Sequence, residues 1–223
     1  MVRTAFWDFL SANPITFGLR CTMRQSVHPT KTHLIETAVV LLENRMPHEI
    51  AVDEILEKSG ISKGSLYHHF EDLAELLESA QVARYANWVD RSIELIVKII
   101  SQAKTKEELF EGLKKMTLLT QSVNFKNFRY ERARTIGNSQ GNERFQKLLA
   151  VEQERLTTSL TDIIREVIEQ GYFDKNLNPH VFAVFIQSYT LGKIVDDVVT
   201  NPLDPNDWDN FINHMVFRSV FPE

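Results

Sequence analysis

The chain has 223 residues, 43% hydrophobic and 25% charged, which is enough apolar material for a core and too much charge for a fibrous or membrane-spanning protein. A formal net charge of −5 excludes a uniformly basic nucleic-acid coat, so any DNA contact must come from a local patch of lysine and arginine. The single cysteine, Cys21, excludes an intramolecular disulfide and a four-cysteine zinc site, and we expect a cytoplasmic protein without targeting segment or membrane span.

Residues 1–29 show no sustained hydrophobic period and mix aromatic residues with Pro14, Gly18 and Pro29. They predict an irregular N-terminal extension. Two interpretations stay open, a genuine extension and a start placed too early, with translation beginning at Met23.

A helical pattern begins at Thr30, where Leu34, Ala38, Leu41 and Leu42 share one helix face. After a break at residues 46–48, a second and shorter helix contains Val52, Ile55 and Leu56. Gly60 marks its end, because glycine readily takes the left-handed conformation that follows a last helical turn. Ser62 is the predicted N-cap of a third helix, which runs to about Phe70. Its side chain can accept a hydrogen bond from the amide of Gly64 or Ser65.

Helical signals continue to the end of the chain, without an internal repeat or an alternating strand pattern of useful length. Asp72 and Glu75 form a capping box, while Asn178-Pro179 and Asp204-Pro205 each place an N-cap before a proline at the first helical position. Gly171 closes the helix before it. A polar and aromatic stretch surrounds residues 125–130. We therefore expect an all-α protein, with later helices at about residues 72–102, 107–120, 142–170, 179–200 and 205–220.

The third helix has an unusual outward face. On a helical wheel Leu66 and Phe70 share one side, and Gly64 and His68, flanked by Ser65 and Tyr67, lie on the other. An ordinary exposed helix face carries mainly Glu, Lys, Gln or Ala. A small, hydrogen-bonding face suits a helix in the DNA major groove, where glycine lets the backbone approach and polar side chains reach phosphates and base edges.

The segment Gly60-Ile61-Ser62-Lys63-Gly64-Ser65-Leu66-Tyr67-His68-His69-Phe70, preceded by Val52-Asp53-Glu54-Ile55 and followed by Leu76-Leu77, resembles the DNA-binding domain of the tetracycline-repressor (TetR) family. The resemblance covers about residues 30–80. It implies a three-helix DNA-binding domain with a helix-turn-helix at 30–80, and a helical ligand-binding and dimerisation domain at 81–223. The resemblance also implies which residues contact DNA or allow its close approach. These are Ser62, Lys63, Gly64, Ser65, Tyr67 and His68.

Several positions depart from the family pattern. Ala51 stands where a threonine usually caps the second helix and touches phosphate, and Leu73 stands where a lysine is common. Residues 30–70 carry four basic side chains against six acidic ones, so we predict few phosphate contacts and a modest salt dependence. We also predict that DNA binding strengthens toward pH 6, because five of the seven histidines lie in this region or just before it. These are His28, His33, His48, His68 and His69.

The C-terminal region has no equally sharp motif. Arg129, Arg132 and Arg134 suit an acidic ligand, but a solvated charged face is the better interpretation of these three residues. Aromatic residues at helical spacing are usually core, yet some of them are candidates for a ligand pocket, which we place at Tyr85, Trp88, Met116, Phe125, Phe128, Phe185 and Tyr189. The resemblance implies that the last two helices form the dimer interface, with candidate residues Phe182, Ile186, Val195, Val198, Trp208, Phe211, Ile212 and Met215.

Enzyme motifs give no coherent site. Ser101 and Lys104 fit an S-x-x-K pattern without its companion motifs, and adjacent His68 and His69 diverge on a helix too far to chelate one metal. We predict no catalytic residue, metal or cofactor, and a ligand-responsive repressor that binds a near-palindromic duplex operator as a homodimer, with a small-molecule effector. Alternatives are a regulator that senses a protein partner or acts as an activator, and a helical adaptor that does not bind DNA.

Overall fold

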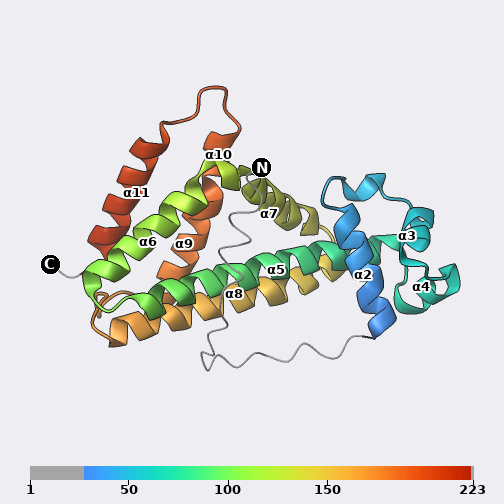
Figure 1. Cartoon of the computed structure of the whole chain (residues 1–223), viewed down its shortest axis with the longest axis horizontal. Helices are drawn as coiled ribbons and strands as arrows, with labels where there is room; N and C mark the ends of the chain where they lie inside the picture. The colour runs from blue at the N-terminus through green and yellow to red at the C-terminus, as the bar shows by residue number, and fades with distance from the viewer. Residues whose placement is uncertain (1–27, 222–223) are drawn as a thin grey trace.

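The computed structural model describes residues 28–221, and every regular element among them is helical (Figure 1). The predicted extension, Met23 and Cys21 lie outside the described residues, apart from His28 and Pro29 at the start of the first helix. The elements, in chain order, are α2 (Pro29–Leu41), the 3-10 turn η1 (Pro47–Glu49), α3 (Val52–Ser59), α4 (Lys63–His69), α5 (Leu73–Gln102), α6 (Lys106–Gln121), the 3-10 turn η2 (Val123–Phe125), α7 (Lys126–Ser139), α8 (Glu143–Glu169), α9 (Pro179–Gly192), α10 (Ile194–Asp197) and α11 (Pro205–Val220).

Two hydrophobic cores follow one another along the molecule. The smaller joins α2, α3 and α4 to the first turns of α5, with Leu34, Ile55 and Leu66 fully buried. In the larger core, α5 and α8 lie side by side, and α6, α9 and α11 lie toward the end far from α2–α4 (Figure 1). On α5, Ala80 belongs to the smaller core and Tyr85 to the larger. One continuous helix therefore connects the two.

Most helix ends follow the chemistry of their caps. The Ser62 hydroxyl accepts from the Ser65 amide at 3.3 Å, Asn178 accepts from two amides, and Asp204 accepts from Asn206. Gly60 has a φ of 66°, the left-handed conformation predicted for the end of α3. These predicted helix boundaries are confirmed.

The prediction of one helix over residues 179–200 is wrong. The helix α9 ends at Gly192, and the chain bends into the short α10 before a loop that leads to α11. The bend brings the Lys193 ammonium onto the Asp196 carboxylate and turns Asp197 inward to Arg129. Polar contacts, rather than continued helical hydrogen bonding, fix this corner.

None of the helices in residues 28–221 combines the length and apolar character needed to cross a bilayer.

Candidate nucleic-acid interface and ligand cavity

The helix α4 is anchored on one side and open on the other. Leu66 is fully buried and Phe70, just after the helix, is 2% exposed. Lys63, Gly64, Tyr67 and His68 are exposed, as is the cap residue Ser62, while Ser65 is half-buried. The structure thus brings all six predicted DNA-contact residues onto the first turns and outward side of one short helix, away from the smaller core.

Gly64 is not required by anything within the described chain. Its φ is not positive, and a Cβ added at this position would meet no heavy atom within 4 Å. Glycine in a helix interior is less stable than alanine by about 0.5–1 kcal/mol, so this position carries a cost without an internal benefit. Packing within the described chain therefore does not explain the glycine at this position.

Basic side chains near α4 are few, and intramolecular contacts occupy several of them. Lys31 lies 4.8 Å from the centre of the Phe70 ring, Arg45 pairs with Glu54 at 2.5 Å, and Lys58 lies 3.6 Å from the same carboxylate. Lys63 has no ion pair with the residues that the structure describes. It is therefore the cation best placed to meet a phosphate at the start of α4.

A histidine cluster lies at the end of α4. The His69 ring centre is 4.8 Å from that of His28 and 5.1 Å from that of His68. Burial, followed by the positive charge that His28 would carry, lowers the pKa of His69 below its usual value. His69 therefore takes up a proton at lower pH than an ordinary histidine does. Within residues 28–221 no group of three His, Cys, Asp or Glu side chains is arranged to hold a metal ion.

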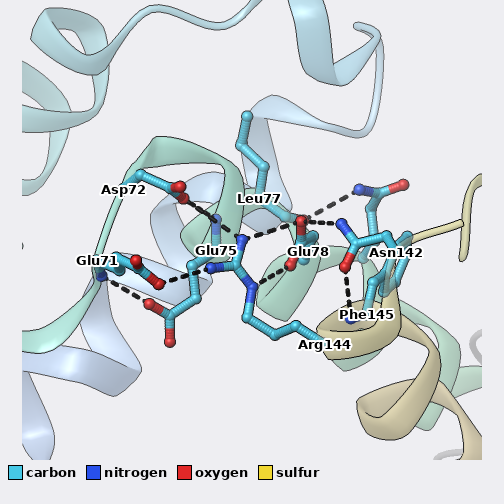
Figure 2. A network of polar contacts seen from close by, with 9 residues as sticks. Glu71, Asp72, Glu75, Leu77, Glu78, Asn142, Arg144 and Phe145 are labelled. Atoms are coloured by element: carbon cyan, nitrogen blue, oxygen red, sulfur yellow. Dashed lines mark hydrogen bonds and ion pairs between the residues drawn. The ribbon is translucent and has the colours of Figure 1, made fainter.

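A polar network behind α4 ties the start of α5 to the start of α8 (Figure 2). The Arg144 guanidinium donates to Glu78 at 2.8 and 3.1 Å and to Glu71 at 3.2 Å, and reaches Asp72 at 3.5 Å. Glu78 is buried and accepts a further bond from Asn142 at 2.7 Å. The contacts with Glu78 raise the pKa of Arg144 above its usual value, which stabilises its charge. Arg144 therefore offsets the charge of the acidic residues that follow α4.

The capping box at α5 differs in one bond from the prediction. Asp72 accepts from the Glu75 amide at 2.7 Å as expected, but the Glu75 carboxylate accepts from the amide of Glu71 rather than Asp72. Ala51, as predicted, gives α3 no side-chain cap.

An apolar cavity of about 60 Å³ lies inside the larger core. Of the seven predicted pocket residues, Met116 and Tyr189 line it; burial raises the pKa of the Tyr189 phenol. The other five lie elsewhere, in aromatic pairs with ring centres 5.4 Å apart for Tyr85–Trp88 and Phe125–Phe128, and with Phe185 partly exposed. Sequence spacing could not have identified the remaining lining residues, because a side chain that faces a cavity has the same helical spacing as an ordinary core residue. The remaining lining residues are Ile96, Ile100, Leu109, Leu113, Thr117, Leu160, Ile163, Ile164, Val167, Phe173, Phe182, Ile186, Val216 and Phe217.

The interpretation of Arg129, Arg132 and Arg134 as a solvated face is wrong for two of them. Arg129 is 3% exposed and Arg132 is 8% exposed, whereas Arg134 is exposed. Arg129 pairs with Asp197 of α10 at 2.5 and 2.8 Å. No carboxylate of the described residues pairs with Arg132, and its pKa is lowered by burial.

The predicted dimer residues fall into two groups. Val195, Val198, Phe211 and Met215 are exposed, 46% or more each. Facing inward instead are Phe182, Ile186 and Ile212, with Trp208 half-buried and donating to Gln121 at 3.0 Å. The inward group packs in the core of the single chain. Further exposed apolar residues of this region, not predicted for the interface, are Val181, Val184 and Phe185 of α9, with Val199 and Leu203 after α10.

Comparison with known proteins places these features in context. Residues 34–80 match the family described as bacterial regulatory proteins, tetR family. No curated protein matches the chain in sequence.

Solved structures share the fold over most of the chain. A putative TetR-family transcriptional regulator from Mesorhizobium loti is 16% identical with a TM-score of 0.62, over 85% of this chain and 94% of that one. A putative transcriptional regulator from Saccharomonospora viridis in complex with choline is 16% identical with a TM-score of 0.60, over 86% and 98%. The transcriptional regulator FadR from Bacillus subtilis in complex with stearoyl-CoA is 16% identical with a TM-score of 0.53, over 83% and 96%.

Proposed function

We propose that this chain, whose residues 34–80 match the tetR family of bacterial regulatory proteins, is a ligand-responsive repressor acting as a cytoplasmic homodimer on a near-palindromic operator. In this proposal the two α4 helices enter successive major grooves about 34–36 Å apart. The contacts with DNA are made by Ser62, Lys63, Ser65, Tyr67 and His68, and Gly64 allows close approach.

The observation that carries the proposal is the outward face of α4. Its anchor residue Leu66 is fully buried, while the opposite residues Gly64, Tyr67 and His68 are exposed. A face that is small, polar and free suits base edges and phosphates better than it suits solvent.

Small-molecule control is supported by the larger domain. The cavity lies among α5, α6, α8, α9 and α11, and α5 continues from this core into the smaller one. The structures from S. viridis and B. subtilis are complexes with choline and stearoyl-CoA, so proteins of this fold bind small molecules of quite different chemistry. A ligand that favours one position of α5 would change DNA affinity, with a typical coupling of about 1–3 kcal/mol.

Homodimer formation is supported by the exposed apolar residues of α9, α10 and α11. Val181, Val184 and Phe185 follow the i, i+3, i+4 spacing of one helix face, and Phe211 and Met215 do the same on α11. Adjacent exposed apolar side chains of this kind mark protein interfaces more often than solvated surface.

Selection of bound sequences from random duplex DNA tests the proposal. We expect enrichment of near-palindromic sites, and loss of binding in Tyr67→Ala with the dimer intact by light scattering. A protein that enriches no duplex sequence, or a Tyr67→Ala variant that binds as the wild type does, would contradict this function.

A further inference from the structure

Arg132 of α7 carries a buried charge that the described chain leaves unbalanced. The side chain is 8% exposed, and its Nε has no hydrogen-bond partner. One helical turn earlier, Arg129 is equally buried, yet its guanidinium donates to both Asp197 oxygens and to the Thr120 carbonyl. Burial of a guanidinium without a counter-charge is costly, and proteins rarely retain it without a compensating partner. The contrast with Arg129 indicates that the partner of Arg132 comes from outside the chain.

Within the described chain Arg132 contacts neutral groups, among them the Tyr85 hydroxyl, which interacts with its guanidinium. The guanidinium carbon lies 3.7 Å from the centre of the Trp88 ring, so the flat face of the cation stacks on the indole. An indole offers no acceptor in the plane of the guanidinium, because its nitrogen is only a donor. Stacking thus fixes the orientation of the group, and its unpartnered Nε is a donor that a carboxylate would satisfy.

The polar side chains linked to the Tyr85 hydroxyl are neutral. The Tyr85 hydroxyl donates to Gln153 at 2.5 Å, Gln153 donates to Gln187 at 2.6 Å, and Gln187 donates to Thr157 at 3.1 Å. This chain of contacts crosses from α5 through α8 to α9. It supplies hydroxyl and amide groups for a polar ligand but no negative charge. The nearby carboxylates of Asp90 and Glu152 pair with Arg155, so an anion beside Arg132 would be the first counter-charge of that guanidinium.

The apolar cavity lies further along α5, where Ile96 is part of its lining. Trp88 packs against the same core cluster as Ile96, and the eight positions that separate them correspond to about 12 Å of helix. Apart from the hydroxyls of Thr117 and Tyr189, the cavity wall is made of hydrocarbon, aromatic and thioether groups. A molecule that satisfied both regions would have an anionic end and an elongated apolar body.

We propose that this chain binds a straight-chain aliphatic carboxylate, with the carboxylate on the N–H edge of Arg132 and the alkyl chain directed along α5 into the cavity. This inference rests on the proposed function, since it names the chemical class of the effector. The cavity of about 60 Å³ is smaller than a typical ligand pocket of about 300–1,000 Å³, so the ligand must separate the helices that surround it. One of these is α5, which also carries the smaller core.

The test uses the full chain without DNA and compares decanoate with 1-decanol by calorimetry and by tryptophan fluorescence. Decanoate is expected to bind roughly 10- to 150-fold more tightly than the alcohol, the range typical of a charge-assisted hydrogen bond. Each added methylene from hexanoate to decanoate is expected to tighten binding about fourfold. Equal binding of the acid and the alcohol, or no binding of either, overturns the proposal.

Two substitutions of arginine on the same helix separate this role from a structural one. Arg132→Met is expected to abolish decanoate binding and to keep or raise the melting temperature without ligand, because it removes an unpaired buried charge. Arg134→Met, at an exposed position, is expected to leave decanoate binding unchanged. Unchanged decanoate affinity in Arg132→Met overturns the proposal. Should that variant fail to fold, the comparison of acid with alcohol in the wild type, together with weakened binding in Arg132→Lys, still decides it.

A last measurement keeps this site distinct from the proposed function. Decanoate that binds through Arg132 and lowers DNA affinity supports both. Decanoate that binds through Arg132 and leaves DNA affinity unchanged supports the site and contradicts the ligand-responsive repressor.

Discussion

The two cores of this protein place their polar groups in opposite ways. Around α2, α3 and α4 the interior is aliphatic and aromatic, and the functional side chains of α4 face outward. The larger domain buries Arg129, Arg132, Lys193 and Asp197 among its helices. A surface that meets a large, highly charged partner needs its polar groups outside, whereas a site for a small molecule needs them inside. Each buried charge in the larger core must therefore be considered together with its partner, because a paired charge supports the structure and an unpaired one can bind a ligand.

The largest expected effect concerns the paired charge. Asp197→Ala leaves Arg129 buried without a counter-ion, and the free energy of unfolding should fall by about 3–5 kcal/mol. Chemical denaturation measures this change. The matched control is Asp162→Ala, which removes an exposed partner of Arg165 and should cost at most about 1 kcal/mol. Equal effects of the two substitutions would contradict the view that Arg129 and Asp197 form a structural pair.

A smaller effect is expected where the two domains meet. Arg144→Met removes charged hydrogen bonds to the buried Glu78 and should lower the free energy of unfolding by about 1.5–3 kcal/mol. It also exposes DNA phosphates to uncompensated Glu71 and Asp72, so DNA affinity should fall in an anisotropy titration.

The control for Arg144 lies on the same helix. Lys147→Met removes an ion pair with Glu143 whose side chains are 74% and 81% exposed, and it should change neither stability nor DNA affinity measurably. If Arg144→Met behaved like Lys147→Met, the network of Figure 2 would have no role in linking the domains.

The smallest expected effect is a pH dependence confined to the smaller core. The pKa of His69 is lower in the folded chain than the usual 6.5, so the unfolded chain binds the proton more readily. Stability should therefore fall as pH drops below about 6.5, and His69→Gln should show a shallower fall in melting temperature. An identical pH profile in the variant would show that His69 does not titrate in this way. The predicted strengthening of DNA binding toward pH 6 then depends on the other histidines.

Sequence reasoning succeeded where polarity follows the ordinary rule. In the smaller core apolar residues recur at helical spacing and caps mark the ends, so α2, α3 and α4 could be placed closely. It failed at α7, where Arg129 and Arg132 are buried while Phe128 and Ile136 are exposed. This inversion hides the helical period, because the pattern assumes that charge faces water.

The candidate sites divide in the same way. The six residues of the α4 face could be selected because a short helix with one apolar side has only one outward side. Cavity and interface residues could not, since Phe182 and Phe185 lie three positions apart on α9 and yet one is buried and the other exposed. The side of α9 that faces the core is set by its packing against α8, and the sequence of α9 alone does not predict that contact.

We propose that the α4 face makes close contact with a DNA backbone, and the substitution Gly64→Leu tests this contact most directly. A side chain at this position points into open space and leucine favours helix over glycine, so thermal unfolding should show equal or greater stability. An anisotropy titration with the selected duplex should nevertheless show DNA affinity reduced roughly 10-fold or more, since one unfavourable contact of about 1.4 kcal/mol has that effect. A folded Gly64→Leu variant that binds the duplex as tightly as the wild type would contradict the account.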